Sequence, residues 1–219
     1  MSTQHQQKSK LQINPQPKYR NIIFDMGGVL VYWKPKEIIA DLFKNEPEKP
    51  WHLIDAVHSR EWLDLDRGTI TTEQAFASVE SRFHHKNLKQ DLIKFWAAVP
   101  AYFAPIPEGI EILRAVQARG YNTYVLSNMM EQGYNRIATF DFVKTFQGCI
   151  YSYQVKAVKP DPDIYHILFN TYQLNPAECI FIDDMDVNIQ GALAVGMDGI
   201  VCNDYKIVWD GLRERGIII

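Results

Sequence analysis

Carboxylates at the ends of short apolar runs are the residues of this sequence best suited to chemistry. Asp25 closes the run at residues 21–25, and Asp183 closes the run at residues 179–183 and is followed by Asp184. If both runs are strands of one parallel sheet, their carboxyl ends lie at the same edge, where open α/β sheets bind ligands. Asp25 and Asp184 would then lie close enough to share a hard cation such as Mg²⁺, which prefers oxygen ligands.

Other polar residues occupy positions that suit phosphate binding. Ser127 and Asn128 end a further apolar run, where a hydroxyl and a backbone N–H could hold phosphate oxygens. The ammonium of Lys159 could neutralise a nucleophile and a transferring group together. Gly27 and Gly28 follow the first run and let backbone N–H groups approach a phosphate closely. Each residue alone is more often a turn former, a helix cap or a surface residue, so the case depends on their order and positions.

Short apolar runs alternate with helical patterns along most of the chain. Two of the helical patterns end at Gly120 and Gly196, and glycine is the usual residue just past a helix end. Asp161 and Pro162 form a helix opening, with Asp161 as the N-cap. The alternation predicts an α/β, Rossmann-like fold in which helices cover both faces of a parallel sheet. The predicted strands are residues 21–25, 123–127, 149–152, 179–183 and 199–202.

The alternation is interrupted between residues 34 and 99, where helical patterns occur without a convincing buried strand. Residues 71–74 form a capping box, and a further helix is expected over residues 88–98. We therefore predict a helical insertion between the first strand and the rest of the sheet. The predicted organisation is a polar N-terminal tail at residues 1–19, a Rossmann-like core at 20–33 and 100–219, and the insertion at 34–99.

The composition limits the class of protein. The chain has 219 residues, of which 47% are hydrophobic, which is enough for one core with a small appended module. A net charge of −3 argues against nucleic acid or an anionic membrane as a partner. The sequence contains neither a signal peptide nor an apolar run as long as a membrane span. Three widely spaced cysteines indicate free thiols, so we expect a cytoplasmic protein. We also expect a monomer or homodimer.

Two early stretches resemble motifs of the haloacid-dehalogenase-like hydrolases. Residues 24–30 resemble the first motif of that family, with Asp25 at the position of the nucleophile. Residues 126–128 resemble the second motif, with Ser127 at the phosphate-binding position.

Two later stretches extend the resemblance. Residues 159–162 resemble the third motif, and residues 181–188 resemble the fourth. In the fourth, Asp184 stands at the metal position and Asn188 at a supporting polar position. Each motif is weak alone, but all of them occur in the family's order, and the resemblance extends over residues 21–202.

The resemblance implies a fold and a reaction. The fold is a Rossmann-like core with a helical cap inserted after the first motif, to which residues 34–99 correspond. The reaction is in-line attack by the Asp25 carboxylate on the phosphorus of a small phosphorylated metabolite, followed by hydrolysis of the aspartyl-phosphate. Mg²⁺ bound by Asp25, Asp184 and the carbonyl of Gly27 would reduce the repulsion between nucleophile and phosphate. Lys159 would assist catalysis, and Ser127, Asn128 and Gly28 would bind substrate.

The sequence departs from the family pattern at Gly27. Family phosphatases usually carry a second Asp here, which protonates the leaving group and later activates water. Gly27 can offer its carbonyl to a metal but cannot transfer protons, and loss of a general acid typically lowers the rate about 10²–10⁴-fold. Asp183 is a candidate for water activation, and support of the neighbouring loop is its alternative role.

Three functions are compatible with a glycine at position 27. The first is a phosphatase for a substrate with a good leaving group, such as a sugar 1-phosphate. A subset of the family that includes bacterial glucose-1-phosphate phosphatases has the same glycine and also resembles residues 66–71. The second is a 2-haloacid dehalogenase, which lacks the second Asp and needs no metal, although Asp183 and Asp184 with the two glycines resemble the metal-using branch. The third is a catalytically weak protein that binds a phosphorylated metabolite.

Specificity is expected to lie in the insertion and its hinge. Tyr32, Trp33 and Lys34 leave the core at this hinge. Trp33 could stack on a sugar ring as a substrate-binding residue, and packing is its alternative role.

Overall fold

The computed structural model describes residues 18–46, 50–83 and 87–217 and contains a parallel sheet of five strands in the order β3-β2-β1-β4-β5. Each predicted apolar run forms one strand, so the predicted Rossmann-like α/β core is confirmed. The predicted tail at residues 1–19 lies almost entirely outside the described residues. The strands are β1 (Asn21–Phe24), β2 (Asn122–Ser127), β3 (Gly148–Tyr151), β4 (Cys179–Asp183) and β5 (Asp198–Val201).

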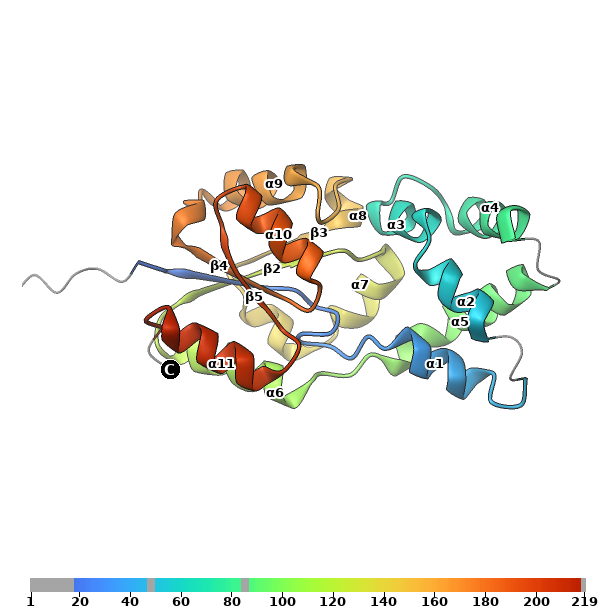
Figure 1. Cartoon of the computed structure of the whole chain (residues 1–219), viewed down its shortest axis with the longest axis horizontal. Helices are drawn as coiled ribbons and strands as arrows, with labels where there is room; N and C mark the ends of the chain where they lie inside the picture. The colour runs from blue at the N-terminus through green and yellow to red at the C-terminus, as the bar shows by residue number, and fades with distance from the viewer. Residues whose placement is uncertain (1–17, 47–49, 84–86, 218–219) are drawn as a thin grey trace, which may run out of the picture.

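Side chains of the central strand β1 alternate between the two faces of the sheet, as strand geometry requires. Ile22 and Phe24 belong to the buried cluster that includes α6 and α11, whereas Ile23 belongs to the cluster that includes α9 and α10. Figure 1 shows these helix pairs on opposite sides of the sheet. Their bounds are α6 (Pro107–Ala118), α11 (Tyr205–Glu214), α9 (Pro162–Tyr172) and α10 (Asp186–Ala194).

Helices α1 to α5 lie between β1 and α6 in the sequence and gather beyond one end of the sheet (Figure 1). We refer to them as the helical insertion. The predicted capping box forms at the start of α4: the N–H of Thr71 donates to Gln74 Oε1 at 2.9 Å, and the N–H of Gln74 donates to Thr71 Oγ1 at 3.2 Å. The helices are α1 (Pro35–Leu42), α2 (Pro50–Val57), α3 (Arg60–Arg67), α4 (Thr72–Phe83) and α5 (Leu88–Tyr102).

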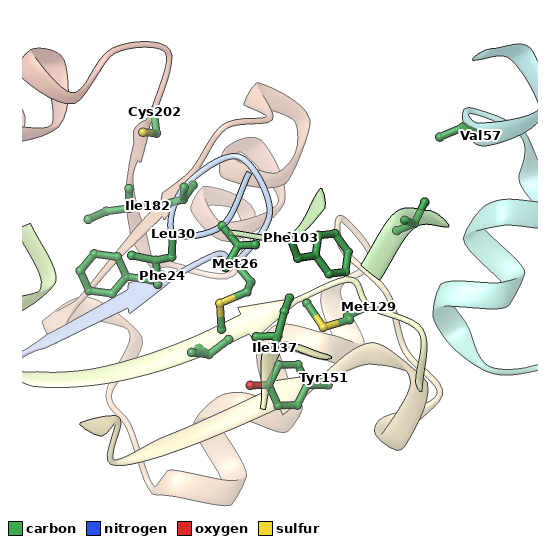
Figure 2. Packing of buried hydrophobic residues seen from close by; sticks show 14 of the residues in the cluster. Phe24, Met26, Leu30, Val57, Phe103, Met129, Ile137, Tyr151, Ile182 and Cys202 are labelled. Carbon is green, nitrogen blue, oxygen red and sulfur yellow. The ribbon is translucent and has the colours of Figure 1, made fainter. Parts of the chain in front are cut away.

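One buried apolar cluster continues from the sheet into the insertion. Figure 2 shows part of this cluster, with Phe24 and Ile182 from the sheet, Met26 and Phe103 beyond the strand ends, and Val57 on the neighbouring insertion helix. Shared burial of this kind attaches the insertion to the core by the hydrophobic effect.

Four short helical segments complete the described structure, and two of them, α7 and α8, follow the carboxyl ends of β2 and β3 in the chain. None of the helices in the described ranges is long and apolar enough to cross a membrane. The segments are α7 (Glu131–Ile137), α8 (Ser152–Val155) and the 3₁₀ turns Asp141–Thr145 and Pro176–Glu178.

The start of α9 differs from the prediction in one respect. Asp161 stands at the N-cap position, but its side chain makes no capping hydrogen bond. Its carboxylate instead accepts a hydrogen bond from Arg67 of the insertion, with Nη2 and Oδ2 2.8 Å apart. The expected helix cap is thus replaced by a contact between insertion and core.

Candidate active site

The carboxylates after β1 and β4 meet at one edge of the sheet. The two strands pair in parallel, with Phe24 opposite Ile182, and the N–H of Asp25 donates to the Ile182 carbonyl at 2.8 Å. Asp25, Asp183 and Asp184 each place one carboxylate oxygen so that all of these oxygens lie within 4.8 Å of one another. The predicted convergence of Asp25 with the two later acids therefore follows from strand pairing.

Lys159 joins two of these acids through its ammonium. Its Nζ lies 2.9 Å from Asp25 Oδ1 and 2.6 Å from Asp183 Oδ2, and the lysine is only 2% exposed. Burial alone would lower the pKa of Lys159, but the carboxylates of Asp183 and Asp25 outweigh burial and hold this pKa above its usual value. The ammonium therefore stays charged beside Asp25.

Asp183 is occupied by protein hydrogen bonds on both oxygens. Oδ1 accepts from the N–H of Met185 at 2.8 Å and from Asn188 Nδ2 at 3.0 Å, while Oδ2 accepts from Lys159 at 2.6 Å and lies 3.1 Å from Asn188 Nδ2. A carboxylate in these contacts positions Lys159 and the loop before α10. This geometry fits the supporting role better than the predicted role in water activation.

Ser127 and Asn128 follow β2 at the same edge but differ in their contacts. The amide of Asn128 makes two bonds with the backbone of Lys159, donating to its carbonyl at 3.0 Å and accepting from its N–H at 2.8 Å. The hydroxyl of Ser127 has only a 3.5 Å contact with the Asn128 carbonyl. The side chain of Asn128 therefore positions Lys159, whereas the Ser127 hydroxyl remains suited to a ligand.

Gly28 makes room for Asp184. Its φ of +73° is in the left-handed region, and a Cβ at this position would lie 2.3 Å from Asp184 Oδ2. Its N–H donates to the Val31 carbonyl at 2.9 Å. The turn therefore already uses the N–H of Gly28, and substrate binding at Gly28 stays a prediction.

Trp33 packs against Gly27 and into the insertion. A Cβ on Gly27 would lie 3.3 Å from the Cβ of Trp33. The indole is stacked on Trp62 at a centroid distance of 6.2 Å and lies 6.0 Å from the ring of Phe103. These contacts fit the packing role of Trp33 better than the predicted stacking on a substrate ring.

The charge balance of the site suits a divalent cation. Burial, followed by the nearby carboxylates, raises the pKa of Asp25 to about 7, and burial, followed by Asp183, raises the pKa of Asp184 to about 6. Asp25 Oδ1 is buried, and although it forms an ion pair with Lys159, it has no well-aligned hydrogen bond within the described residues. One ammonium does not balance the close carboxylates, and their oxygens are the donors that a hard cation prefers. Asp25 and Asp184 are therefore suitable metal ligands.

The insertion supplies a further acid, Asp66, which was not among the site residues predicted from the sequence. Asp66 lies in the last turn of α3. Burial, followed by the charge of Asp25, raises its pKa to about 7, while the charge of Lys159 and then the backbone N–H of Met130 oppose this rise. An acid in the last turn of a helix is disfavoured by the helix dipole, so its position there was the available signal.

Comparisons with known proteins found a matching family and several similar proteins. The family model described as haloacid dehalogenase-like hydrolase matches residues 19–196. The sesquiterpene phosphatase astK of Aspergillus oryzae is 25% identical, over 90% of this chain and 96% of its own. The phosphorylated carbohydrates phosphatase of Thermotoga maritima is 23% identical, over 90% and 91%. The (S)-2-haloacid dehalogenase 1 of a Pseudomonas strain is 27% identical, over 61% and 59%.

Solved structures share the fold. A HAD-like hydrolase from Porphyromonas gingivalis superposes with a TM-score of 0.68 at 20% identity, over 90% of this chain and 98% of its own. A HAD family enzyme from Bacteroides thetaiotaomicron, in complex with magnesium and inorganic phosphate, gives a TM-score of 0.63 at 20% identity, over 87% and 99%. At these identities the likeness establishes the fold.

Proposed function

The chain belongs to the haloacid dehalogenase-like hydrolases and is a hydrolase, and from this premise we propose that it is a Mg²⁺-dependent phosphatase acting on a small phosphorylated metabolite. The observation that carries the proposal is the juxtaposition of Asp25 with Asp184, Asp183 and Lys159 at one sheet edge. A carboxylate nucleophile, a second metal ligand and a fixed ammonium are what phosphoryl transfer to an aspartate requires.

In the proposed reaction Asp25 attacks phosphorus in line with the leaving oxygen, and water then hydrolyses the aspartyl-phosphate. Lys159 holds the attacking carboxylate in place and stabilises negative charge on the transferring group, and Asn128 fixes the lysine backbone. Ser127 is placed to donate its hydroxyl to a phosphate oxygen. Mg²⁺ held by Asp25, Asp184 and the Gly27 carbonyl would supply charge neutralisation between nucleophile and phosphate when bound. A magnesium and phosphate complex of the Bacteroides thetaiotaomicron neighbour supports this choice of cation.

The proposed substrate is a phosphate ester with a good leaving group, such as a sugar 1-phosphate. Gly27 brings no acid to the leaving oxygen, so an oxygen that leaves easily suits the site. One relative is a phosphatase of phosphorylated carbohydrates and another a sesquiterpene phosphatase, which supports a phosphorylated substrate but leaves the alcohol open.

We propose that the helical insertion, predicted at residues 34–99, is a cap that closes over the core of residues 20–33 and 100–219. Such a cap excludes water and selects the substrate. The cytoplasmic location and the monomeric or homodimeric state stay predictions.

A second candidate function is 2-haloacid dehalogenation. The resemblance to the Pseudomonas dehalogenase and the glycine at position 27 favour it. The close packing of Asp184 on Gly28 argues for the metal-using phosphatase, because it adds an acid beside the nucleophile.

The deciding experiment measures phosphate release from sugar 1-phosphates, sugar 6-phosphates and other phosphorylated metabolites, with Mg²⁺ and with EDTA. Asp25→Asn is the inactive control, and Asp163→Asn, at an exposed site on α9, is the matched acid substitution. Mg²⁺-dependent release that is lost only in Asp25→Asn supports the proposal. Halide release from 2-haloacids in EDTA would replace it with the dehalogenase function. Binding of phosphorylated metabolites without turnover would indicate a binding protein.

A further inference from the structure

The end of α3 is fastened to the core by polar contacts, which we call the latch. The buried hydroxyl of Ser152 donates to the Asp66 carbonyl at 2.5 Å and accepts from the N–H of Met129 at 2.8 Å. Lys156 donates to the Gly68 carbonyl at 2.7 Å. The ion pair of Arg67 with Asp161 at 2.8 Å is a further part of the latch.

The latch brings the side chain of Asp66 to the sheet edge that holds the nucleophile. Met129 and Met130 belong to the loop that follows β2, and the backbone N–H of Met130 is near enough to the Asp66 carboxyl to lower its pKa. That loop begins directly after Ser127, whose strand pairs with the strand that ends before Asp25. Asp66 therefore enters the site from the insertion side.

The loop after Asp25 has little space for an acid of its own. The side chain of any residue replacing Gly27 would meet Trp33, whose ring is stacked on Trp62. Trp33 would have to shift by a few tenths of an ångström before a Cβ could fit. A leaving oxygen that needs a proton would therefore have to receive it from another part of the chain.

The in-line geometry of phosphoryl transfer favours the insertion as the source of a proton donor. In phosphoryl transfer the attacking and leaving oxygens lie on opposite sides of phosphorus. Asp25 attacks from the core, so the leaving oxygen faces away from the sheet. A proton donor for that oxygen is best placed on the insertion.

We propose that Asp66 is a catalytic residue that transfers the proton in place of the acid missing at position 27; this inference rests on the proposed phosphatase function. In the first step the Asp25 oxygen bonds to phosphorus, the bond from phosphorus to the leaving oxygen breaks, and that oxygen takes the proton of the Asp66 carboxyl. In the second step water bonds to phosphorus, gives a proton to the Asp66 carboxylate, and the bond between Asp25 and phosphorus breaks. The products are an alcohol and phosphate, and Asp66 is protonated again.

The protonation behaviour of Asp66 agrees with this role. Burial and the charge of Asp25 raise its pKa to about 7. A carboxyl group with a pKa near neutrality can give a proton in one step and accept one in the next.

The test compares alkyl phosphates with nitrophenyl phosphate, whose leaving group needs no proton. Asp66→Asn is expected to lower kcat/KM for alkyl phosphates about 10²–10⁴-fold and to leave nitrophenyl phosphate nearly unchanged. Asp163→Asn, at an exposed site on α9 outside the latch, is the matched acid control. Ser152→Ala keeps the carboxyl of Asp66 but removes both latch bonds of the Ser152 hydroxyl, and should give a smaller loss with the same dependence on the leaving group.

The outcomes separate the two proposals. The Mg²⁺-induced rise in Tm, measured without substrate, should be retained in Asp66→Asn and shows that this variant is folded with an intact sheet edge. Equal losses on both substrate classes, or no loss on either, would overturn the role of Asp66 and leave the phosphatase function standing. If the unaltered protein releases phosphate from neither class, the proposed function and this inference fall together.

Discussion

The sheet edge and the helical insertion hold their polar groups in different ways. At the sheet edge Lys159 and Asp183 are almost fully buried, and strand pairing fixes the backbone that carries Asp25. At the latch Arg67 and Asp161 keep 27% and 52% of their side chains exposed, and Lys156 is exposed. Buried charges are costly to leave unpaired, whereas exposed ion pairs contribute little. The polar groups of the edge are therefore built for fixed geometry, whereas the charged contacts of the latch are the weaker ones.

Replacing the buried lysine should show the largest difference between the two regions. Lys159→Met leaves Asp25 and Asp183 buried without their ammonium, and should lower the free energy of unfolding by about 3–5 kcal/mol. Lys156→Met removes one exposed hydrogen bond, to the Gly68 carbonyl, and should change the free energy of unfolding by about 0.5 kcal/mol. Urea denaturation of both variants measures these values. Similar losses in the two variants would contradict the distinction between edge and insertion.

The pH dependence of stability tests whether Asp66 of the insertion interacts electrostatically with the acids at the sheet edge. The folded pKa values are raised to about 7 for Asp25 and Asp66 and to about 6 for Asp184, from the ordinary aspartate value of 3.8. Between 3.8 and these values the folded protein binds more protons than the unfolded chain, so stability falls as pH rises through this window.

The metal-free protein should accordingly lose on the order of 2–4 kcal/mol of unfolding free energy between about pH 4.5 and pH 7.5. Chemical denaturation in EDTA at several pH values measures this loss, and Mg²⁺ should restore part of it near pH 7.5. Asp184→Asn and Asp66→Asn should each flatten the decline, whereas Asp163→Asn should not. If Asp66→Asn leaves the pH-dependent decline in unfolding free energy unchanged, Asp66 does not interact with the acids at the sheet edge in solution.

Two glycines with positive φ provide a matched pair, one in each region. Gly28→Ala and Gly68→Ala both place an alanine in the left-handed region, and each should lower the free energy of unfolding by about 1–2 kcal/mol. The new Cβ at position 28 would meet Asp184 Oδ2 at 2.3 Å, whereas at position 68 the nearest atom is the flexible Lys156 Nζ at 2.7 Å. Gly28→Ala should therefore abolish the Mg²⁺-induced rise in Tm, and Gly68→Ala should keep it. Loss of the rise in both variants would argue that the insertion shapes the metal site.

The sheet and its edge could be predicted from the sequence because both follow from local patterns. Short apolar runs mark buried strands, and parallel strands bring their ends to one edge, so residue order alone was enough to group Asp25 and Asp184. Alternation of β1 side chains between the two faces follows from the same regularity.

The contacts that could not be predicted depend on packing between distant segments. The turn that uses the Gly28 N–H, the bonds of Asn128 to Lys159 and the packing of Trp33 on Trp62 all depend on side-chain geometry that no periodicity encodes. Asp66 was missed because its role depends on which surface of the insertion meets the core. That surface is selected by aromatic packing and by the buried hydroxyl of Ser152.

The smallest expected effect concerns the exposed ion pair of the latch. Arg67→Met removes the contact with Asp161 and should lower the free energy of unfolding by less than about 1 kcal/mol, because both side chains remain partly in water. If the pair serves to hold the insertion closed, the loss should appear as a rise in KM of up to about fivefold, equivalent to about 1 kcal/mol, with kcat nearly unchanged. Added salt should produce a similar rise in the unaltered protein, since exposed charges are screened.

Arg82→Met is the matched control, because Arg82 pairs with Glu61 at 2.6 Å inside the insertion and does not reach the core. It should leave KM and its salt dependence unchanged. Steady-state kinetics on the best substrate at two ionic strengths separate the variants. A hundredfold fall in kcat for Arg67→Met would show that the latch positions reacting groups as tightly as the sheet edge does. The contrast between a fixed edge and a weaker latch would then fail, since an exposed ion pair would be controlling the chemical step.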